Sequence, residues 1–295
     1  MANGILIVDK PAGWTSMDVC AKLRGMFHEK RVGHAGTLDP MATGVLPVFL
    51  GRATRAVEFA ADSDKEYIAG LKLGVTTNTQ DITGEIVEER PADVTREQLW
   101  AVLEGFTGDI EQVPPMYSAI KIGGKKLYEL ARKGKEVERR PRPVTIHALG
   151  VLEGPERGAD FTLRVACSKG TYVRTLCHDI GQALGCGGCM SSLQRVKAAG
   201  FTLEDSVSLE AVQEAVDRGE GEGLLLPVDA YFARNGWKNS VTVRPDAEKR
   251  LRNGGCVPTP GMEAECRVYS ESGEFLGLGS SEGTRLRLIK SFFAV

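Results

Sequence analysis

The chain has 295 residues, 42% of them hydrophobic and 26% charged, with a formal net charge of −2. This balance is typical of a globular protein, and the length predicts one large domain, or one large and one small domain. No apolar run approaches the ~18 residues of a membrane helix. The N-terminus also lacks the basic and apolar regions of a signal peptide, so we expect no membrane association and a cytoplasmic location.

The seven cysteines predict reduced thiols rather than a disulfide framework, because their number is odd and no secretion signal precedes them. Cys186 and Cys189 form a C-x-x-C pair, and Cys167 and Cys177 are the nearest candidates to complete a zinc site. Their spacing matches no zinc finger or ribbon, so we expect no metal.

The charge is unevenly distributed. Residues 121–144 contain nine Lys and Arg against three Glu, which gives this segment +6 and leaves −8 for the rest of the chain. Residues 203–222 hold seven acidic residues and one Arg. Blocks of this kind create local fields that the net charge conceals, so a polyanionic partner stays open.

The first third of the chain predicts a strand, a helix, a loop and a second strand. Residues 4–9 are a short apolar run, and Thr15 with Asp18 is typical of a helix N-terminus, the helix ending near His28. The loop 31–44 leads into an apolar strand at 45–51. A short helix is expected over residues 52–61.

Further along, the periodicity changes several times. Gly123-Gly124 inside an apolar stretch indicates a hairpin. The other expected elements are strands at 65–74, 143–152 and 160–168, a helix after the capping box at 95–98, a helix after Thr171, and a helix from Ser208 to about Asp217.

The C-terminal part has a different pattern. Residues 241–260 and 265–280 alternate like short strands separated by tight turns. This predicts a small β-rich module at 235–295 after a larger domain at 1–234. Since the larger part has no regular βαβ rhythm, we expect an α+β fold with a mixed or antiparallel central sheet flanked by helices.

Asp39 stands in a tight loop between Gly36 and Gly44 and is followed by Pro40. Glycines permit backbone conformations that other residues resist, and proline favours an extended residue before it. Such a loop can hold one carboxylate in a fixed, exposed position. A structural Asp-Pro turn is the alternative.

Arg174 lies in the first turn of the helix expected after Thr171. A cation there opposes the helix dipole, which predicts another partner, and a carboxylate suits the forked guanidinium. Lys169-Gly170 in the same turn is suited to a phosphate or another anion. A surface arginine is the competing interpretation.

Tyr67 can be a core aromatic or can stack on a base, and the lone His34 can be structural. The sequence contains no nucleophile elbow, no Walker-type phosphate loop and no G-x-G-x-x-G. A hydrolase that uses Asp39 as nucleophile stays open, although the basic segment disfavours it.

Four stretches together identify a resemblance: DKPAGWTS (9–16), GHAGTLDPMATGVLP (33–47), KEYIAGLKLGVTTNTQD (65–81) and CSKGTYVRTLCHDIG (167–181), the last followed by LGCG and SSLQR. In this order they resemble the bacterial tRNA pseudouridine-55 synthases of the TruB type. The resemblance covers about residues 4–205. It continues more weakly into a C-terminus similar to a PUA-like RNA-binding module.

The resemblance implies catalytic roles for Asp39, Arg174 as its partner, and Tyr67, which would stack on the uracil and accept the C5 proton. It places five residues at the substrate: His34, Leu193, Lys10, Tyr172 and Asp81. The basic segment 117–144 matches an insertion that grips the T arm of tRNA. Contacts to the RNA backbone are expected from Lys121, Lys125, Lys126, Arg132, Lys133, Arg139, Arg140 and Lys169.

This chemistry needs neither metal nor cofactor, and we expect a monomer with no obligatory protein partner. Two departures are visible. Leu193-Gln194-Arg195 stands where Leu-Arg-Arg is expected, so one basic contact is missing, and Cys189 stands where other members carry different residues, which argues further against a metal. A guide-RNA-dependent pseudouridine synthase and a tRNA-binding folding chaperone are the alternatives. The first is typically longer with basic tails. Binding without turnover, as in the second, would need a degraded catalytic set, whereas Asp39, Tyr67 and Arg174 are all present.

Overall fold

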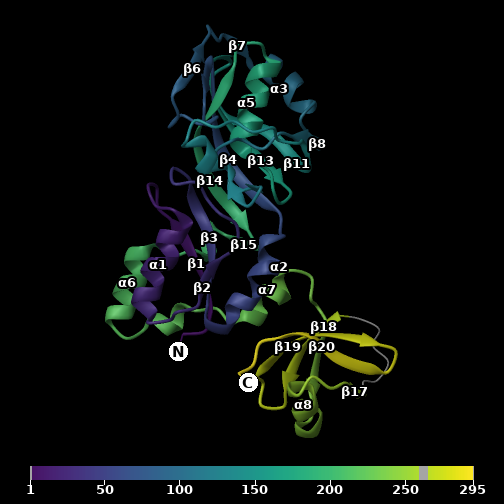
Figure 1. Ribbon diagram of the computed structural model, residues 1–295. Coiled ribbons are helices and arrows are strands. Elements are labelled where there is room, and N and C mark those ends of the chain that lie inside the picture. The colour runs from purple at the N-terminus through teal and green to yellow at the C-terminus, as the bar shows by residue number, and fades with distance from the viewer. Residues whose placement is uncertain (1, 259–264, 295) are drawn as a thin grey trace.

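The computed structural model describes residues 2–258 and 265–294, and its centre is a mixed sheet of nine strands (Figure 1). All pairs in this sheet are antiparallel except β3–β14, which is parallel. The predicted α+β fold with a mixed central sheet is confirmed. In sheet order the strands are β1 (Gly4–Lys10), β3 (Thr43–Leu50), β14 (Gly188–Ala198), β4 (Lys65–Leu73), β13 (Asp160–Cys167), β11 (Arg142–Glu153) and β8 (Gly108–Gln112), with β2 (Val32–His34) on β3 and β15 (Phe201–Thr202) on β14.

Helices accompany both halves of the sheet. Figure 1 shows α3 (Arg96–Glu104) and α5 (Val173–Ala183) beside the upper half, and α1 (Ser16–Phe27) and α6 (Leu209–Asp217) beside the lower half. Capping boxes at Thr15 and Thr95 and the Ser208 cap begin three of these helices as predicted. The described helices include none that is both long and apolar enough to cross a membrane.

The remaining elements of the larger part are short. The helix expected over 52–61 is a 3-10 helix, η1 (Gly51–Ala56), followed by one turn of α-helix, α2 (Val57–Ala61). The other elements are β5 (Val75–Thr77), β6 (Ile86–Glu89), β7 (Val94–Thr95), β9 (Lys121–Ile122), β10 (Lys125–Lys126), α4 (Leu127–Ala131), β12 (Arg157–Gly158), η2 (Leu203–Asp205), η3 (Gly221–Leu224) and α7 (Val228–Arg234).

The C-terminal module is a five-stranded sheet in the order β16 (Ser240–Val243), β18 (Glu265–Ser270), β19 (Phe275–Glu282), β20 (Arg285–Ser291) and β17 (Val257–Pro258). The predicted β-rich character is confirmed, but the continuous strand pattern over 241–260 is wrong. Pro245–Arg252 forms the helix α8, which begins with proline at its first position and buries Leu251. Residues 259–264, at the end of that prediction, lie outside the described residues.

Aromatic packing joins the module to the larger part. Phe232 of α7 lies 5.5 Å from Phe292 and 6.0 Å from Phe275, measured between ring centroids. Arg52 and Arg55 donate to the main-chain oxygens of Phe292 and Ser291 at 3.0 and 2.9 Å. These contacts fix the module against α7 and η1.

The two halves of the central sheet meet where β3 approaches β14. Gly44 of β3 has a φ of +98°, and a Cβ atom there would lie 2.2 Å from the main-chain oxygen of Arg195. Only glycine therefore permits this approach. The junction places the loop before β3, which carries Asp39, beside the strands β14 and β4.

Candidate active site

Lys10, whose side chain is fully buried, supports the loop that carries Asp39. Its Nζ donates to the main-chain oxygens of Pro11, Trp14 and Pro40 at 2.8, 2.6 and 3.3 Å. Burial lowers the pKa of Lys10 to about 8. The ammonium is occupied by main-chain oxygens, so the geometry makes Lys10 a support for the Asp39 loop.

Arg174 brings three parts of the chain together. Its Nη2 lies 3.4 Å from Asp39 Oδ1 and also donates to the main-chain oxygen of Tyr117 at 2.8 Å. Its Nη1 lies 3.5 Å from Asp81 Oδ2. The carboxylate partner expected for a cation in the first turn of α5 is therefore present, and a second carboxylate accompanies it.

Asp81 is itself held rigidly. The residue is 4% exposed, and its Oδ1 accepts from Thr79 Oγ1 at 3.0 Å and from the main-chain nitrogen of Thr83, also at 3.0 Å. These bonds leave Oδ2 facing Arg174. A fixed carboxylate on the far side of the guanidinium restricts how Arg174 can turn, and this in turn fixes its contact with Asp39.

The carboxylate of Asp39 is under opposing influences. Its side chain is 33% exposed. Burial raises the pKa of Asp39, the Arg174 guanidinium opposes this rise, and the nearby Asp81 carboxylate adds to it. Arg174 is thus the main group that favours the ionised form of Asp39, and the Lys10 ammonium adds to its effect.

Tyr67 and Leu193 share one face of the sheet beside this carboxylate. Tyr67 of β4 lies opposite Arg195 of β14, and Ala69 lies opposite Leu193. Directly opposed residues of an antiparallel pair point to the same face, and so do residues two apart in one strand. Burial raises the pKa of Tyr67, and Arg195 acts against this rise. A base entering here would meet an aromatic ring and an aliphatic side chain.

Arg195 was assigned no role from the sequence. It is 1% exposed, and its Nε and Nη2 donate to the main-chain oxygens of Val45 and Gly36 at 2.8 and 3.1 Å. One signal was available: Arg195 stands two residues after Leu193, on the buried face of an alternating strand. A charged residue on such a face needs partners.

His34 and Tyr172 flank the site. Burial lowers the pKa of His34, with the charge of Arg195 contributing, and its buried Nδ1 has no hydrogen-bond partner. Tyr172 precedes α5, and its main-chain N–H and C=O bond the side chain of Gln112 at 3.0 and 3.3 Å. The Arg174 guanidinium lies 6.0 Å from the Tyr172 ring centre.

The basic segment 117–144 forms the β9–β10 hairpin and α4, which Leu127 anchors through full burial. Arg139 is tied down, because it donates to Glu136 at 2.8 Å and to the main-chain oxygen of Pro114 at 3.3 Å. Lys126 and Arg132 lie over the ring of Tyr128. Within this segment, the exposed members of the predicted set are Lys121, Lys125, Arg132, Lys133 and Arg140.

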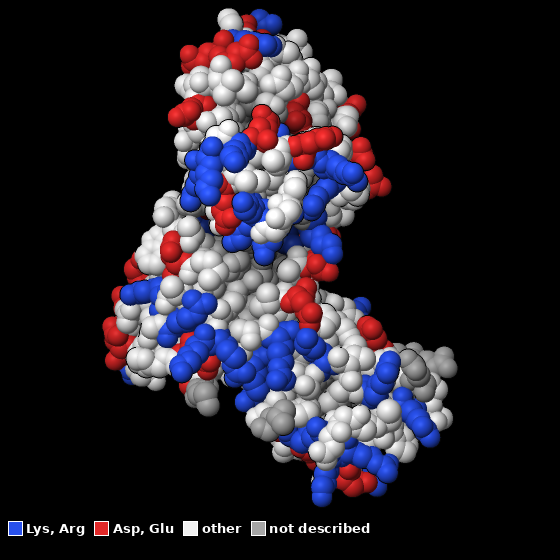
Figure 2. Space-filling model, viewed as in Figure 1, with Lys and Arg blue, Asp and Glu red and all other residues white. Residues whose placement is uncertain are grey.

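This segment begins beside Arg174, since the main-chain oxygen of Tyr117 accepts from that guanidinium. Figure 2 shows Lys and Arg side chains gathered above and below the narrow middle of the viewed face. Lys169, in the turn before α5, pairs with Asp62 at 2.9 Å, and both side chains are more than half exposed. An exposed pair of this kind stabilises little, so Asp62 does not hold Lys169 firmly.

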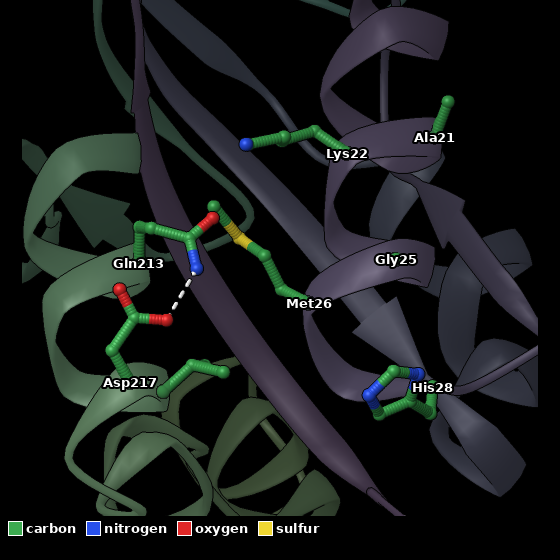
Figure 3. Close-up of a pocket in the computed structure, with 8 residues that line it drawn as sticks. Ala21, Lys22, Gly25, Met26, His28, Gln213 and Asp217 are labelled. Carbon is green, nitrogen blue, oxygen red and sulfur yellow. Dashed lines mark hydrogen bonds between the residues drawn. The ribbon is translucent and has the colours of Figure 1, made fainter.

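A hollow of about 410 Å³ lies elsewhere, between α1 and α6. Lys22 and His28 line it from one side and Gln213 and Asp217 from the other (Figure 3), with Gln213 Nε2 donating to Asp217 at 2.8 Å. None of the site residues predicted from the sequence lines this hollow. The side chains of Asp39, Arg174 and Asp81, which contact one another, lie outside this hollow.

All seven cysteines are free thiols, and Cys186 and Cys189 are buried. Among residues 2–258 and 265–294, no three His, Cys, Asp or Glu side chains gather in a group that could hold a metal ion.

Comparison with known proteins gives two family matches. The TruB family pseudouridylate synthase N-terminal domain matches residues 24–173, and the tRNA pseudouridylate synthase B C-terminal domain matches residues 174–233. The chain is 50% identical over 292 residues to a tRNA pseudouridine synthase B of Lachnoclostridium phytofermentans, covering 94% of each protein. It is 46% identical over 278 residues to the protein of that name from Dechloromonas aromatica, covering 94% of this chain and 91% of that protein.

Among solved structures, a chain in a crystal structure of a Cbf5-Nop10-Gar1 complex is similar, with a TM-score of 0.74 and 26% identity. The match covers 99% of this chain and 85% of that one. The fold, the two family matches and the relatives at 46% and 50% identity agree. The chain therefore belongs to the TruB family of pseudouridylate synthases.

Proposed function

We propose that this enzyme converts uridine 55 in the T loop of tRNA to pseudouridine, with Asp39 as the catalytic carboxylate. The observation that carries the proposal is the contact of Asp39 with Arg174, on a loop that Lys10 supports beside Tyr67 and Leu193. Relatives that cover more than nine-tenths of the chain bear the name tRNA pseudouridine synthase B.

The reaction breaks the N1–C1′ bond of the nucleoside, turns the uracil and joins its C5 to C1′. The base is stacked in a folded loop, so it must leave the stack before these side chains can reach it. Unstacking costs a few kcal/mol, which contacts with phosphates and stacking on an aromatic ring can offset. Tyr67 and Leu193 would receive the base, and His34, with its unpartnered Nδ1, would lie near the flipped nucleotide.

Asp39 must be ionised for each of the roles open to it: addition to uracil C6, attack on ribose C1′, or removal of the 2′ hydrogen to give a glycal. Among these we favour the glycal route, from family chemistry. Arg174 supports all three, because it favours the carboxylate form and fixes its direction.

Tyr67 would act late in the reaction. After C5 bonds to C1′, C5 carries a hydrogen and the ring has an N1=C6 double bond. The Tyr67 phenolate takes the C5 proton, the C–H electron pair forms C5=C6, and N1 gains a proton from water. The phenol then returns its proton to solvent, and the product is neutral pseudouridine.

The RNA grip would come from exposed cations and from the C-terminal module. The proposed backbone contacts are Lys121, Lys125, Lys126, Arg132, Lys133, Arg139, Arg140 and Lys169. Arg139 would first have to leave its bonds to Glu136 and Pro114. Residues 235–295 would form a PUA-like RNA-binding module beside a catalytic domain at 1–234, in a monomeric, cytoplasmic enzyme that acts alone and without metal.

One second function has a specific observation in its favour. The similar Cbf5 chain was solved in a complex with Nop10 and Gar1, which makes a partner-dependent enzyme the alternative. The two functions differ in one requirement, because an enzyme that acts alone needs only the protein and its tRNA.

The test is to incubate the protein with an unmodified tRNA transcript, without any other RNA or protein, and to map pseudouridine by chemical labelling and primer extension. We expect one modified position, at uridine 55, and none in a transcript that carries cytidine there. Modification elsewhere would refute the assigned position. No modification of a bound transcript would favour the partner-dependent alternative.

A further inference from the structure

Arg195 is a buried cation to which the proposed reaction assigns no role. Arg195 is 1% exposed and is the largest fully buried side chain of the described residues. Burying a charge is unfavourable unless hydrogen bonds and opposite charge compensate it. Two of its nitrogens donate to main-chain oxygens, at Val45 and Gly36, and Tyr67 of β4 lies directly opposite it on the same face of the sheet.

The surrounding chain leaves room for this side chain. A Cβ atom at Gly36 would lie 3.3 Å from Arg195 Nη1, so a larger residue at 36 would crowd the guanidinium. The pairing of β14 with β4 shifts register between Arg195 and Lys197. A bulge of this kind redirects a side chain and often lies next to an active site. Arg195 therefore lies between the Asp39 loop and Tyr67.

We propose that Arg195 is a positioning residue that holds the Tyr67 hydroxyl in place and stabilises its phenolate form for removal of the C5 proton. This role of Arg195 rests on the proposed function, in which Tyr67 is the proton acceptor. A phenol must ionise to accept that proton, and a buried phenolate without a cation beside it would be very unfavourable.

The charged and titratable groups around the pair are consistent with this role. Arg195 lowers the pKa of Tyr67, whereas Cys167 of β13 and Asp39 act in the opposite direction. The Arg195 charge also contributes to the lowered pKa values of His34, Lys10 and Lys65. Among these groups Arg195 is thus the one that favours the phenolate.

Arg195 also supports the Asp39 loop through Gly36, so a loss of activity alone would not separate the two roles. A tRNA carrying deuterium at C5 of uridine 55 separates them. If the variant acts through Tyr67, C5 deprotonation becomes slower and the deuterium isotope effect on product formation rises. If the substitution acts through Asp39, a step before C5 deprotonation becomes slower, and the isotope effect stays unchanged or falls.

The experiment compares wild type, Arg195→Gln and Arg195→Lys in single turnover with protium and deuterium at C5. We expect Arg195→Gln to slow pseudouridine formation about 10- to 100-fold, within the range of general-base catalysis, and to raise the isotope effect. Arg195→Lys, which keeps a charge, is expected to lie between the two. This second variant keeps the test decisive if Arg195→Gln fails to fold.

Two further variants complete the design. In a Tyr67→Phe background, Arg195→Gln should cause little additional loss, because residues that act as one unit are not additive. Arg24→Gln is the matched control: it removes a guanidinium that donates to the Val32 oxygen, at the start of the same loop, at 2.9 Å. We expect this control to show the wild-type isotope effect.

An unchanged isotope effect in both Arg195 variants, or full additivity with Tyr67→Phe, would refute the role of Arg195 while leaving pseudouridine formation by the wild type intact. Failure of the wild type to form pseudouridine would instead refute the proposed function.

Discussion

Asp81→Asn tests whether the second carboxylate on Arg174 matters for catalysis. Asn keeps an oxygen that can accept from Thr79 and Thr83 but removes the charge 3.5 Å from the guanidinium. At an effective dielectric constant of about 20, the gross attraction over that distance is about 4–5 kcal/mol, much of which desolvation offsets. We expect a net loss of about 1–3 kcal/mol in transition-state stabilisation, or about 5- to 150-fold in kcat.

The same substitution has a second consequence, for pH dependence. The Asp81 carboxylate raises the pKa of Asp39, so its removal should lower that pKa. Asp39 then stays ionised to lower pH, and the acid limb of the rate profile should move down. The deficit of the variant relative to wild type should therefore shrink as the pH falls.

The assay is single-turnover pseudouridine formation from pH 5 to 8, with tRNA affinity measured in parallel. Asp160→Asn is the matched control, because Asp160 forms an exposed pair with Lys72 on the same sheet. A kcat within twofold of wild type would refute the positioning of Arg174 by Asp81. An equal loss of tRNA affinity would make Asp81 a general structural residue.

Three further predictions concern the supports of the site and the RNA grip. Gly44→Ala should destabilise the fold by at least ~2 kcal/mol in chemical unfolding, because the φ of +98° disfavours alanine and its Cβ would lie 2.2 Å from a main-chain oxygen of β14. An unchanged unfolding midpoint would contradict the close approach of β3 to β14. Lys10→Met should leave buried main-chain oxygens without donors and lower the free energy of unfolding by about 2–4 kcal/mol in the same assay. An unchanged free energy of unfolding would mean that the Asp39 loop does not depend on Lys10. Changing Lys121, Lys125 and Lys133 to Glu should weaken tRNA binding and flatten its salt dependence by about 0.7–0.9 per lost phosphate contact; an unchanged slope in filter binding would exclude this segment as the electrostatic grip.

Elements with local signals were predicted from the sequence. The capping boxes at Thr15 and Thr95 predicted their helices, and the glycine pair 123–124 predicted its hairpin. These predictions were possible because each signal acts within a few residues of the chain. The helix α8 was missed because its sequence is mostly charged, and only Ala247 and Leu251 mark its buried side. Its proline at the first position was the available signal.

In the candidate site too, features with a local signal could be predicted from the sequence, and features that depend on distant strands could not. Arg174 could be predicted to need a carboxylate, because its place in the first turn of α5 is a local feature, and Asp39 lies 3.4 Å away. The position of Arg195 opposite Tyr67 depends on the register of β14 against β4, and the hydrogen bonds of Arg195 to the Asp39 loop depend on the parallel approach of β3. Long-range register of this kind leaves no mark at a fixed spacing in the sequence.

The most direct test of the account is tritium release from a tRNA transcript labelled at uridine C5, with wild type and Asp39→Asn in parallel and EDTA present. We expect release by the wild type and none by Asp39→Asn. The tRNA affinity of the variant should stay within about tenfold of wild type, because the proposed RNA contacts lie in other segments. Release by Asp39→Asn at the wild-type rate would contradict the central role of this carboxylate. Loss of tRNA binding together with activity would make Asp39 a structural residue of its loop.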